Sequence, residues 1–251
     1  MFPSNTKQHH RFSQLRHAFV SGLRHPMFVM MVVFGIVYGC ISLVNHANFR
    51  TNALDLGAYT NAMYDYVHGR FNDSTVFKVS PENLLADHFD LYLILFSPLL
   101  LLFGTSTLLV VQIAALMLGG LGTYRCIKQR SNQRYLAILA ALSFYCSFGV
   151  FAALSFDYHS NVVAACLVPW LIDAVNRNQW KRTLVFGVLI LIAKENMALW
   201  LFFIAIGLAL LDRKTPKKAF LLLGFSAMCL LYFALVIGVV MPSLSLNSAY
   251  P

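Results

Sequence analysis

The sequence predicts an all-α protein that crosses a membrane several times. Hydrophobic residues make up 59% of the chain and charged residues 12%, whereas soluble domains have about 45–50% and about 25%. The apolar residues form long runs, and the basic residues lie in short clusters between these runs. Basic clusters of this kind mark loops that face the cytoplasm. We therefore attribute the net charge of +9 to membrane topology and expect a lipid bilayer, and no nucleic acid, as the partner.

The N-terminal residues 1–26 form a basic tail that we expect to stay in the cytoplasm, close to lipid headgroups. Residues 27–44 are the first predicted span, because 18 residues are about enough to cross a hydrocarbon core of ~30 Å. No small-residue cleavage site follows this run, which is typical of an uncleaved signal anchor.

Residues 45–104, which include the polar run 52–90, are predicted to form the first extracytoplasmic loop. Apolar residues at helical spacing between 55 and 68 predict an amphipathic helix at the membrane surface. The run 91–103 is short for a span and contains a proline, so we expect it to dip into the bilayer and return. A crossing there would export the basic cluster at 125–134, contrary to the positive-inside rule. The loop holds six of the ten carboxylates of the chain, which are Asp55, Asp65, Asp73, Glu82, Asp87 and Asp90.

Six further spans complete a predicted domain of about seven, covering residues 27–241. Fifteen of the nineteen basic residues then fall on the inner side, and only Asp173 and Asp212 among the acids do so. Lys194 and Glu195 divide one apolar stretch, and we expect two short helices that meet at a polar knee, since a continuous helix would bury both charges at a cost of several kcal/mol. Residues 242–251 are the predicted extracytoplasmic end, after which a larger protein could continue. The six ranges are 105–124, 135–154, 161–175, 183–193, 197–211 and 219–240.

Acidic residues and histidines recur in the loops that this topology places outside. Charged groups so close to hydrocarbon are either solvated at the interface or gathered into a site. Asp55 is either an ordinary first-turn carboxylate of its helix or a general base. The remaining candidates are Asp87, His88, Asp157, His159, Lys194 and Glu195. Their carboxylates and imidazoles could ligate a divalent cation, although their spacing matches no strict metal motif.

Four short motifs carry a resemblance to known proteins. They are Leu54-Asp55-Leu56-Gly57, Asp87-His88-Phe89 with Ser97-Pro98, Phe156-Asp157-Tyr158-His159 and Lys194-Glu195-Asn196. In this order they resemble a bacterial family of multi-pass membrane proteins of unknown function. That family in turn resembles the GT-C superfamily of glycosyltransferases, which implies a GT-C-like fold in the inner membrane and a polyprenyl-phosphate sugar as the donor.

The same resemblance implies roles for the candidate residues. Asp55 would be the catalytic base that acts on an acceptor hydroxyl. Lys194 and Glu195 would belong to the catalytic group, with either Lys194 or a bound metal stabilising the departing lipid phosphate. The possible metal ligands, which include the predicted binding residues, are Asp87, His88, Asp157, His159 and Glu195. Superfamily members usually have more spans and an acid beside the catalytic one, and Asp55 has no such neighbour.

Two other functions compete with glycosyl transfer. A transporter or a non-catalytic scaffold for envelope assembly would share the membrane fold. Transporters place charges near the middle of the bilayer and show repeated halves, whereas here the charges gather in loops and no repeat is visible. A proton or metal relay built from His88, His159 and Glu195 is a third hypothesis.

Overall fold

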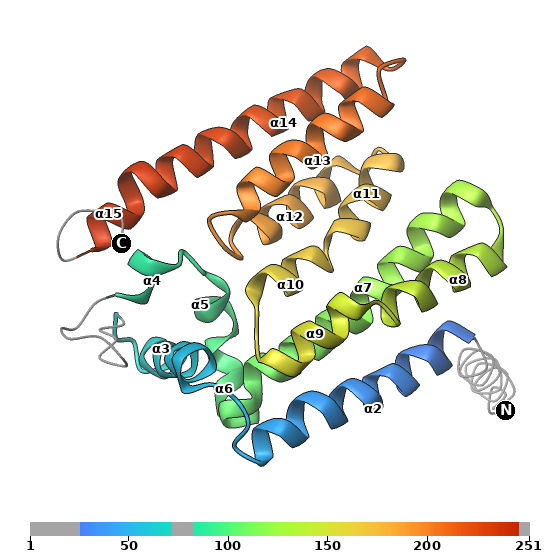
Figure 1. Ribbon diagram of the computed structural model, residues 1–251. Helices are drawn as coiled ribbons and strands as arrows, with labels where there is room; N and C mark the ends of the chain where they lie inside the picture. Colours follow the sequence, from blue (N-terminus) through green and yellow to red (C-terminus); the bar gives the residue numbers. More distant parts are fainter. Residues whose placement is uncertain (1–25, 72–82, 246–251) are drawn as a thin grey trace, which may run out of the picture.

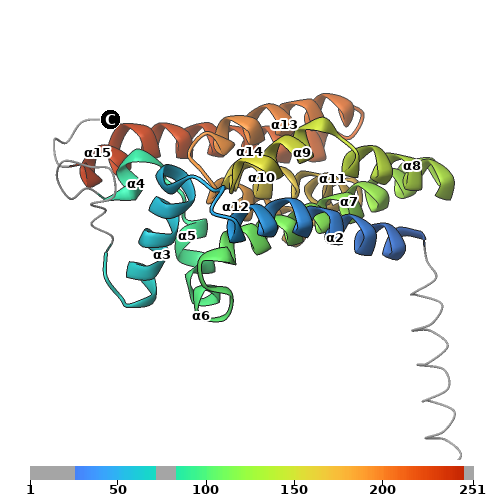
Figure 2. The same cartoon turned by 60° about the horizontal axis from the view of Figure 1, so that its bottom comes forward.

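The computed structural model describes residues 26–71 and 83–245, and every regular element in these two stretches is a helix. The longer helices lie side by side in an elongated layer, and a group of short helices gathers at one of its ends (Figure 1). Seen from another side, part of this group projects out of the layer (Figure 2). The predicted tail 1–26, the loop residues 72–82 and most of the predicted end 242–251 lie outside the described residues.

The helices that form the layer lie where the sequence predicts spans. Their bounds are α2 (Pro26–Ala47), α7 (Thr107–Ser131), α8 (Arg134–Tyr145), α9 (Phe148–Phe156), α10 (Ser160–Ala165), α11 (Val168–Asn176), α12 (Trp180–Leu191), α13 (Met197–Leu211) and α14 (Pro216–Leu235). A π-helical turn, η4 (Val236–Val240), and α15 (Met241–Leu244) continue α14. The short helices between α2 and α7 are η1 (Ala53–Gly57), α3 (Ala58–Val67), α4 (Leu84–Asp87), α5 (Tyr92–Phe96), η2 (Ser97–Leu99), α6 (Leu100–Phe103) and η3 (Gly104–Ser106).

Four helical segments of the described chain are long and apolar enough to cross a membrane, namely Pro26–Ala47, Tyr92–Ser131, Arg134–Phe156 and Pro216–Leu244. Two more, Ser160–Asn176 and Met197–Leu211, are apolar but shorter. With its 12 residues, α12 rises about 18 Å, which is less than a hydrocarbon core of ~30 Å. The all-α membrane class is confirmed, whereas the count of about seven spans is not.

Local chemistry explains where the helices break. The run 91–103 forms the short helices α5, η2 and α6, with Pro98 at the start of η2 and Gly104 in a left-handed conformation (φ 55°) directly after α6. Pro169 opens α11 and separates it from α10, because proline suits a first helical turn. The polar knee at Lys194 and Glu195 separates α12 from α13, as the sequence predicts.

Small residues on α7 allow neighbouring helices to approach closely. A Cβ atom on Gly120 would overlap the ring of Tyr145, which is fully buried on α8. The Tyr145 hydroxyl donates a hydrogen bond to the Met117 carbonyl at 2.8 Å, which fixes the ring against α7. Close packing over glycine is the usual way in which membrane helices associate, since lipid offers little hydrophobic drive between them.

The layer has two chemically different ends. The connections α7–α8, α11–α12 and α13–α14 lie together at one end, where α2 also begins (Figure 1). These connections and the adjoining helix turns contain the basic clusters at 125–134, 177–182 and 213–218, so we name this the basic end. The opposite end, with the α3–α6 group, the α9–α10 connection and the α12–α13 connection, is named the acidic end.

Candidate functional site

The connection between α9 and α10 is held at the acidic end by a buried glutamine on α7. Gln112 is fully buried, and its Nε2 donates to the Asp157 carbonyl at 2.7 Å. Its Oε1 accepts a hydrogen bond from the His159 backbone amide at 2.8 Å. The backbone of Asp157 has φ 139°, a conformation that is otherwise nearly confined to glycine. Gln112 therefore stabilises a strained turn that places two predicted site residues.

Asp157 also fixes the start of the first loop. Its Oδ2 accepts a hydrogen bond from the Asn52 backbone amide at 2.7 Å, across 105 residues of sequence. Asn52 directly precedes η1, the π-helical turn that contains Asp55. Because one oxygen of Asp157 is used for this contact, the geometry supports a positioning role for this carboxylate.

The return leg of the first loop is attached to the knee between α12 and α13. Glu195 is 7% exposed, and its Oε2 accepts a hydrogen bond from the Phe89 amide at 3.0 Å. Its Oε1 lies 3.8 Å from Nδ1 of His88, an ion pair whenever the imidazole is protonated. The Leu91 amide donates to the Ile192 carbonyl at 3.0 Å. These contacts make the first loop and the knee one unit.

Asp90 is the most deeply buried carboxylate of this unit, with 1% of its surface exposed. Burial raises its pKa from an ordinary 3.8 to about 7. Three groups lower this pKa again in part: the Ser160 hydroxyl and the Tyr92 amide, which donate hydrogen bonds, and the positive charge of Lys194. The negative charge of Glu195 raises it further. Near pH 7 this carboxyl is therefore divided between its protonated and ionised forms.

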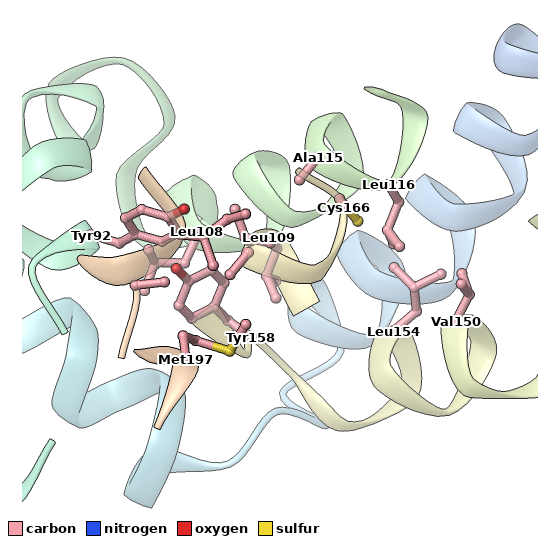
Figure 3. Close-up of a cluster of buried hydrophobic side chains, with 14 of the residues drawn as sticks. Tyr92, Leu108, Leu109, Ala115, Leu116, Val150, Leu154, Tyr158, Cys166 and Met197 are labelled. Carbon is pink, nitrogen blue, oxygen red and sulfur yellow. The ribbon is translucent and has the colours of Figure 1, made fainter. Parts of the chain in front are cut away.

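Tyrosine side chains surround Asp90. Burial and the charge of Asp90 raise the pKa of Tyr59, of Tyr66 (to about 12) and of Tyr158. The ring of Tyr59 stands edge-on to that of Tyr158, with centroids 6.2 Å apart. Figure 3 shows Tyr158 and Tyr92 packed with Leu108, Leu109 and Met197 in the buried core. Within the described chain, the buried hydroxyls of Tyr66 and Tyr158 have no hydrogen-bond partner, which is unusual for buried polar groups.

Asp55 and Lys194 lie near the same imidazole, that of His159. The charge of Asp55 raises the pKa of His159 and the charge of Lys194 lowers it, while burial, the largest effect, leaves it below its ordinary value. The His159 ring stacks on Phe156 at 5.2 Å between centroids. Both Asp55 and Lys194 are half-buried, and in the described stretches neither side chain has a hydrogen bond or an ion pair. π-Helical turns such as the one bearing Asp55 occur frequently at functional sites.

The structure thus brings the predicted candidates to the acidic end. Asp87 ends α4 close enough for its charge to act on Tyr59. The predicted metal ligands do not meet in a metal-binding geometry, because the described residues include no group of three or more His, Cys, Asp or Glu that could hold an ion. The reaction proposed below therefore involves no divalent cation.

Two residues that shape this site were not among the sequence candidates. Asp90 directly follows the motif Asp87-His88-Phe89 and lies two residues before the apolar helix α5, a position that was an available signal. Gln112 is the single uncharged amide in an apolar stretch of α7, which is a recognisable sign of a buried polar contact.

These features define a multi-pass α-helical membrane protein with a polar site at one end. The chain belongs to the family described as predicted membrane protein (DUF2079), whose model matches residues 45–250 and so includes the entire site. No curated protein and no solved structure gave a match. The comparisons do not confirm the resemblance to the GT-C superfamily.

Proposed function

We propose that the protein transfers a sugar from a polyprenyl-phosphate donor to an acceptor hydroxyl at its acidic end. The observation that carries this proposal is that the carboxylate of Asp55 and the ammonium group of Lys194 both lie near the imidazole of His159. Neither group has a hydrogen bond or an ion pair in the described chain. Transfer from a lipid phosphate needs a base for the acceptor and a cation for the leaving group.

In the proposed reaction Asp55 takes the proton of the acceptor hydroxyl as its oxygen attacks the anomeric carbon. The bond between that carbon and the phosphate oxygen breaks, and the configuration of the sugar inverts. The lipid phosphate leaves with the electron pair, and the ammonium group of Lys194 stabilises its negative charge. Glu195 and Asp157 position the loops that carry these two residues.

The buried polar groups beside the reacting pair serve as the sugar subsite of this proposal. The carboxyl of Asp90 can donate as well as accept a hydrogen bond near pH 7, and the buried hydroxyls of Tyr66 and Tyr158 have no partner in the described chain. Hydroxyl-rich ligands need such mixed donors and acceptors, because each sugar hydroxyl both gives and takes a hydrogen bond.

The proposed orientation places the acidic end outside and the N-terminus inside, in the inner membrane of a bacterium. The gathering of the basic clusters at the opposite end supports it, since positively charged loops stay in the cytoplasm. A transporter is less well supported, because Lys194 and Glu195 lie at the ends of two helices rather than halfway along one.

Binding of the leaving group is the first test. The full chain in detergent is titrated with a polyprenyl monophosphate, and complex formation is followed by native mass spectrometry. We expect Lys194→Met to weaken binding at least tenfold, because the phosphate loses its cation. Arg50→Gln, which removes an exposed positive charge preceding the first loop helices, is the matched control and should bind normally. Equal binding by both variants would refute the role of Lys194.

The second test measures sugar transfer. Radiolabelled polyprenyl-phosphate hexoses serve as donors, and the release of polyprenyl phosphate is measured. Asp55→Asn should abolish release while it keeps lipid binding, because only the base is lost. Asp65→Asn is the control, since the carboxylate of Asp65 on α3 lies 2.7 Å from the guanidinium of Arg70. Undiminished release by Asp55→Asn would remove the proposed base, and binding without release by the native chain would assign a non-catalytic scaffold instead.

A further inference from the structure

A second polar cleft lies at the basic end, far along the helices from the site described above. It is formed by α7, α11 and α12, and its volume is about 180 Å³. A cavity of about 10–15 Å³ on this measure already holds one water molecule, so the cleft is large enough for a small polar headgroup. The lining residues are Arg125, Trp170, Asp173, Ala174, Gln179, Arg182 and Phe186.

The wall of the cleft is a fixed tryptophan. The indole Nε1 of Trp170 donates a hydrogen bond to the Leu118 carbonyl at 2.9 Å. Gly122 allows this approach, because a Cβ atom there would lie 2.6 Å from the same nitrogen. The guanidinium carbon of Arg125 lies 5.2 Å from the centre of the Trp170 ring, a cation–π contact that orients the arginine over the cleft.

The charge of the cleft is positive and largely unpaired. Its acid, Asp173, is neutralised by Arg177, whose Nε lies 3.0 Å from both carboxylate oxygens. Arg182 donates one hydrogen bond to the side chain of Gln179 at 2.9 Å. In the described part of the chain, neither Arg125 nor Arg182 forms an ion pair with a carboxylate. Two guanidinium groups therefore face the cleft with most of their donors unused.

We propose that this cleft binds the phosphate group of an anionic phospholipid. Guanidinium groups match phosphate oxygens in pairs, and a fixed aromatic wall holds them in place. Arg125 precedes the end of α7 by six residues, about 9 Å along the helix. The cleft therefore lies just inside the end of the layer, where lipid headgroups meet a membrane helix.

Exposed apolar side chains beside the cleft favour a lipid over a soluble phosphate. Leu118 shares a face of α7 with Arg125 and is 47% exposed. On α12, Val185 follows Arg182 by one turn and is 56% exposed. Both side chains lie between the cleft and the middle of the layer. They give the acyl chains of a bound lipid an apolar surface to contact.

The test measures lipid retention by the full chain after detergent purification, using native mass spectrometry with phosphatidylglycerol as the probe. The double variant Arg125→Gln/Arg182→Gln should retain at least tenfold less phosphatidylglycerol than the native chain. Arg213→Gln/Lys214→Gln removes the same charge from exposed positions at the same end and should retain it normally. Equal loss in the two double variants would overturn the proposal, because general attraction to the basic end would then explain retention.

Lysine variants and competition by soluble phosphates test the lipid site in two further ways. Arg125→Lys/Arg182→Lys preserves the charge but loses the paired donors, so it should bind phosphatidylglycerol less tightly even if the glutamine variant fails to fold. Inorganic phosphate or glycerol 3-phosphate at millimolar concentration should not displace the lipid. Displacement by either, or lysine variants that bind as well as the native chain, would overturn the assignment to a lipid headgroup held by arginine.

Discussion

The buried carboxyl of Asp90 should make the stability of the fold depend on pH. Its pKa in the folded chain is about 7, compared with an ordinary 3.8. Between these values the folded state holds one proton more than the unfolded state, so the free energy of unfolding falls by about 1.4 kcal/mol per pH unit as the pH rises. The stabilisation is complete below the unfolded pKa and is lost once the pH exceeds the folded pKa.

From pH 5 to pH 8 this group alone should lower the free energy of unfolding by about 3 kcal/mol. In the variant Asp90→Asn residue 90 cannot ionise. From pH 5 to pH 8 the variant should therefore lose about 3 kcal/mol less free energy of unfolding than the native chain. For a chain of this size the change corresponds to roughly 6–12 °C in the midpoint of thermal unfolding. The assay is circular dichroism of the protein in detergent micelles at pH 5, 6, 7 and 8.

Asp65→Asn is the control, because the carboxylate of Asp65 on α3 is paired with Arg70, which follows that helix. It should follow the native chain at each pH. If Asp90→Asn and the native chain lost stability in parallel from pH 5 to pH 8, the carboxyl of Asp90 would not titrate in this range, and the reasoning from its burial would be refuted.

Three further changes should alter stability by amounts that thermal unfolding can measure. Gly120→Ala should lower the free energy of unfolding by roughly 1–3 kcal/mol, because the new Cβ overlaps Tyr145. Gly39→Ala has open space around it and should be neutral or slightly stabilising. Equal effects of the two changes would contradict the close packing of α7 and α8. Asp157→Gly should be more stable than Asp157→Ala by roughly 1–3 kcal/mol. Both variants lose the same hydrogen bond, but only glycine relieves the backbone strain at φ 139°. The reverse order of stability would argue against strain at this position. Gln112→Ala should cost roughly 2–4 kcal/mol because it leaves two buried backbone groups unpaired, and a cost below 1 kcal/mol would show that the turn does not depend on it.

The positions of the helices could be predicted because hydropathy and charge act locally. Apolar runs, prolines and basic clusters determine where α2, α7 and α14 begin and end. The polar knee was also predictable, since a lysine and a glutamate in the middle of a membrane helix are costly. The number of crossings was not, because hydropathy does not distinguish a helix that faces lipid from a short one packed among its neighbours.

The site could be predicted only in part, for a physical reason. A polar loop facing water can be recognised from sequence, so Asp55, His159 and Glu195 were candidates. The contacts that arrange them are made by tertiary structure: Asn52 meets Asp157, and Phe89 meets Glu195, across more than one hundred residues. Burial, which gives Asp90 its raised pKa, likewise depends on the residues that surround it after folding.

The hydrogen bond between Phe89 and Glu195 has a consequence for how the protein is made. Its two residues are 106 positions apart, and ribosomes add about 5–20 residues per second. After Phe89 has been synthesised, roughly 5–20 seconds pass before Glu195 exists. Throughout that interval the nascent loop lacks its final partner, so a truncated product that stops after α11 cannot assemble the acidic end.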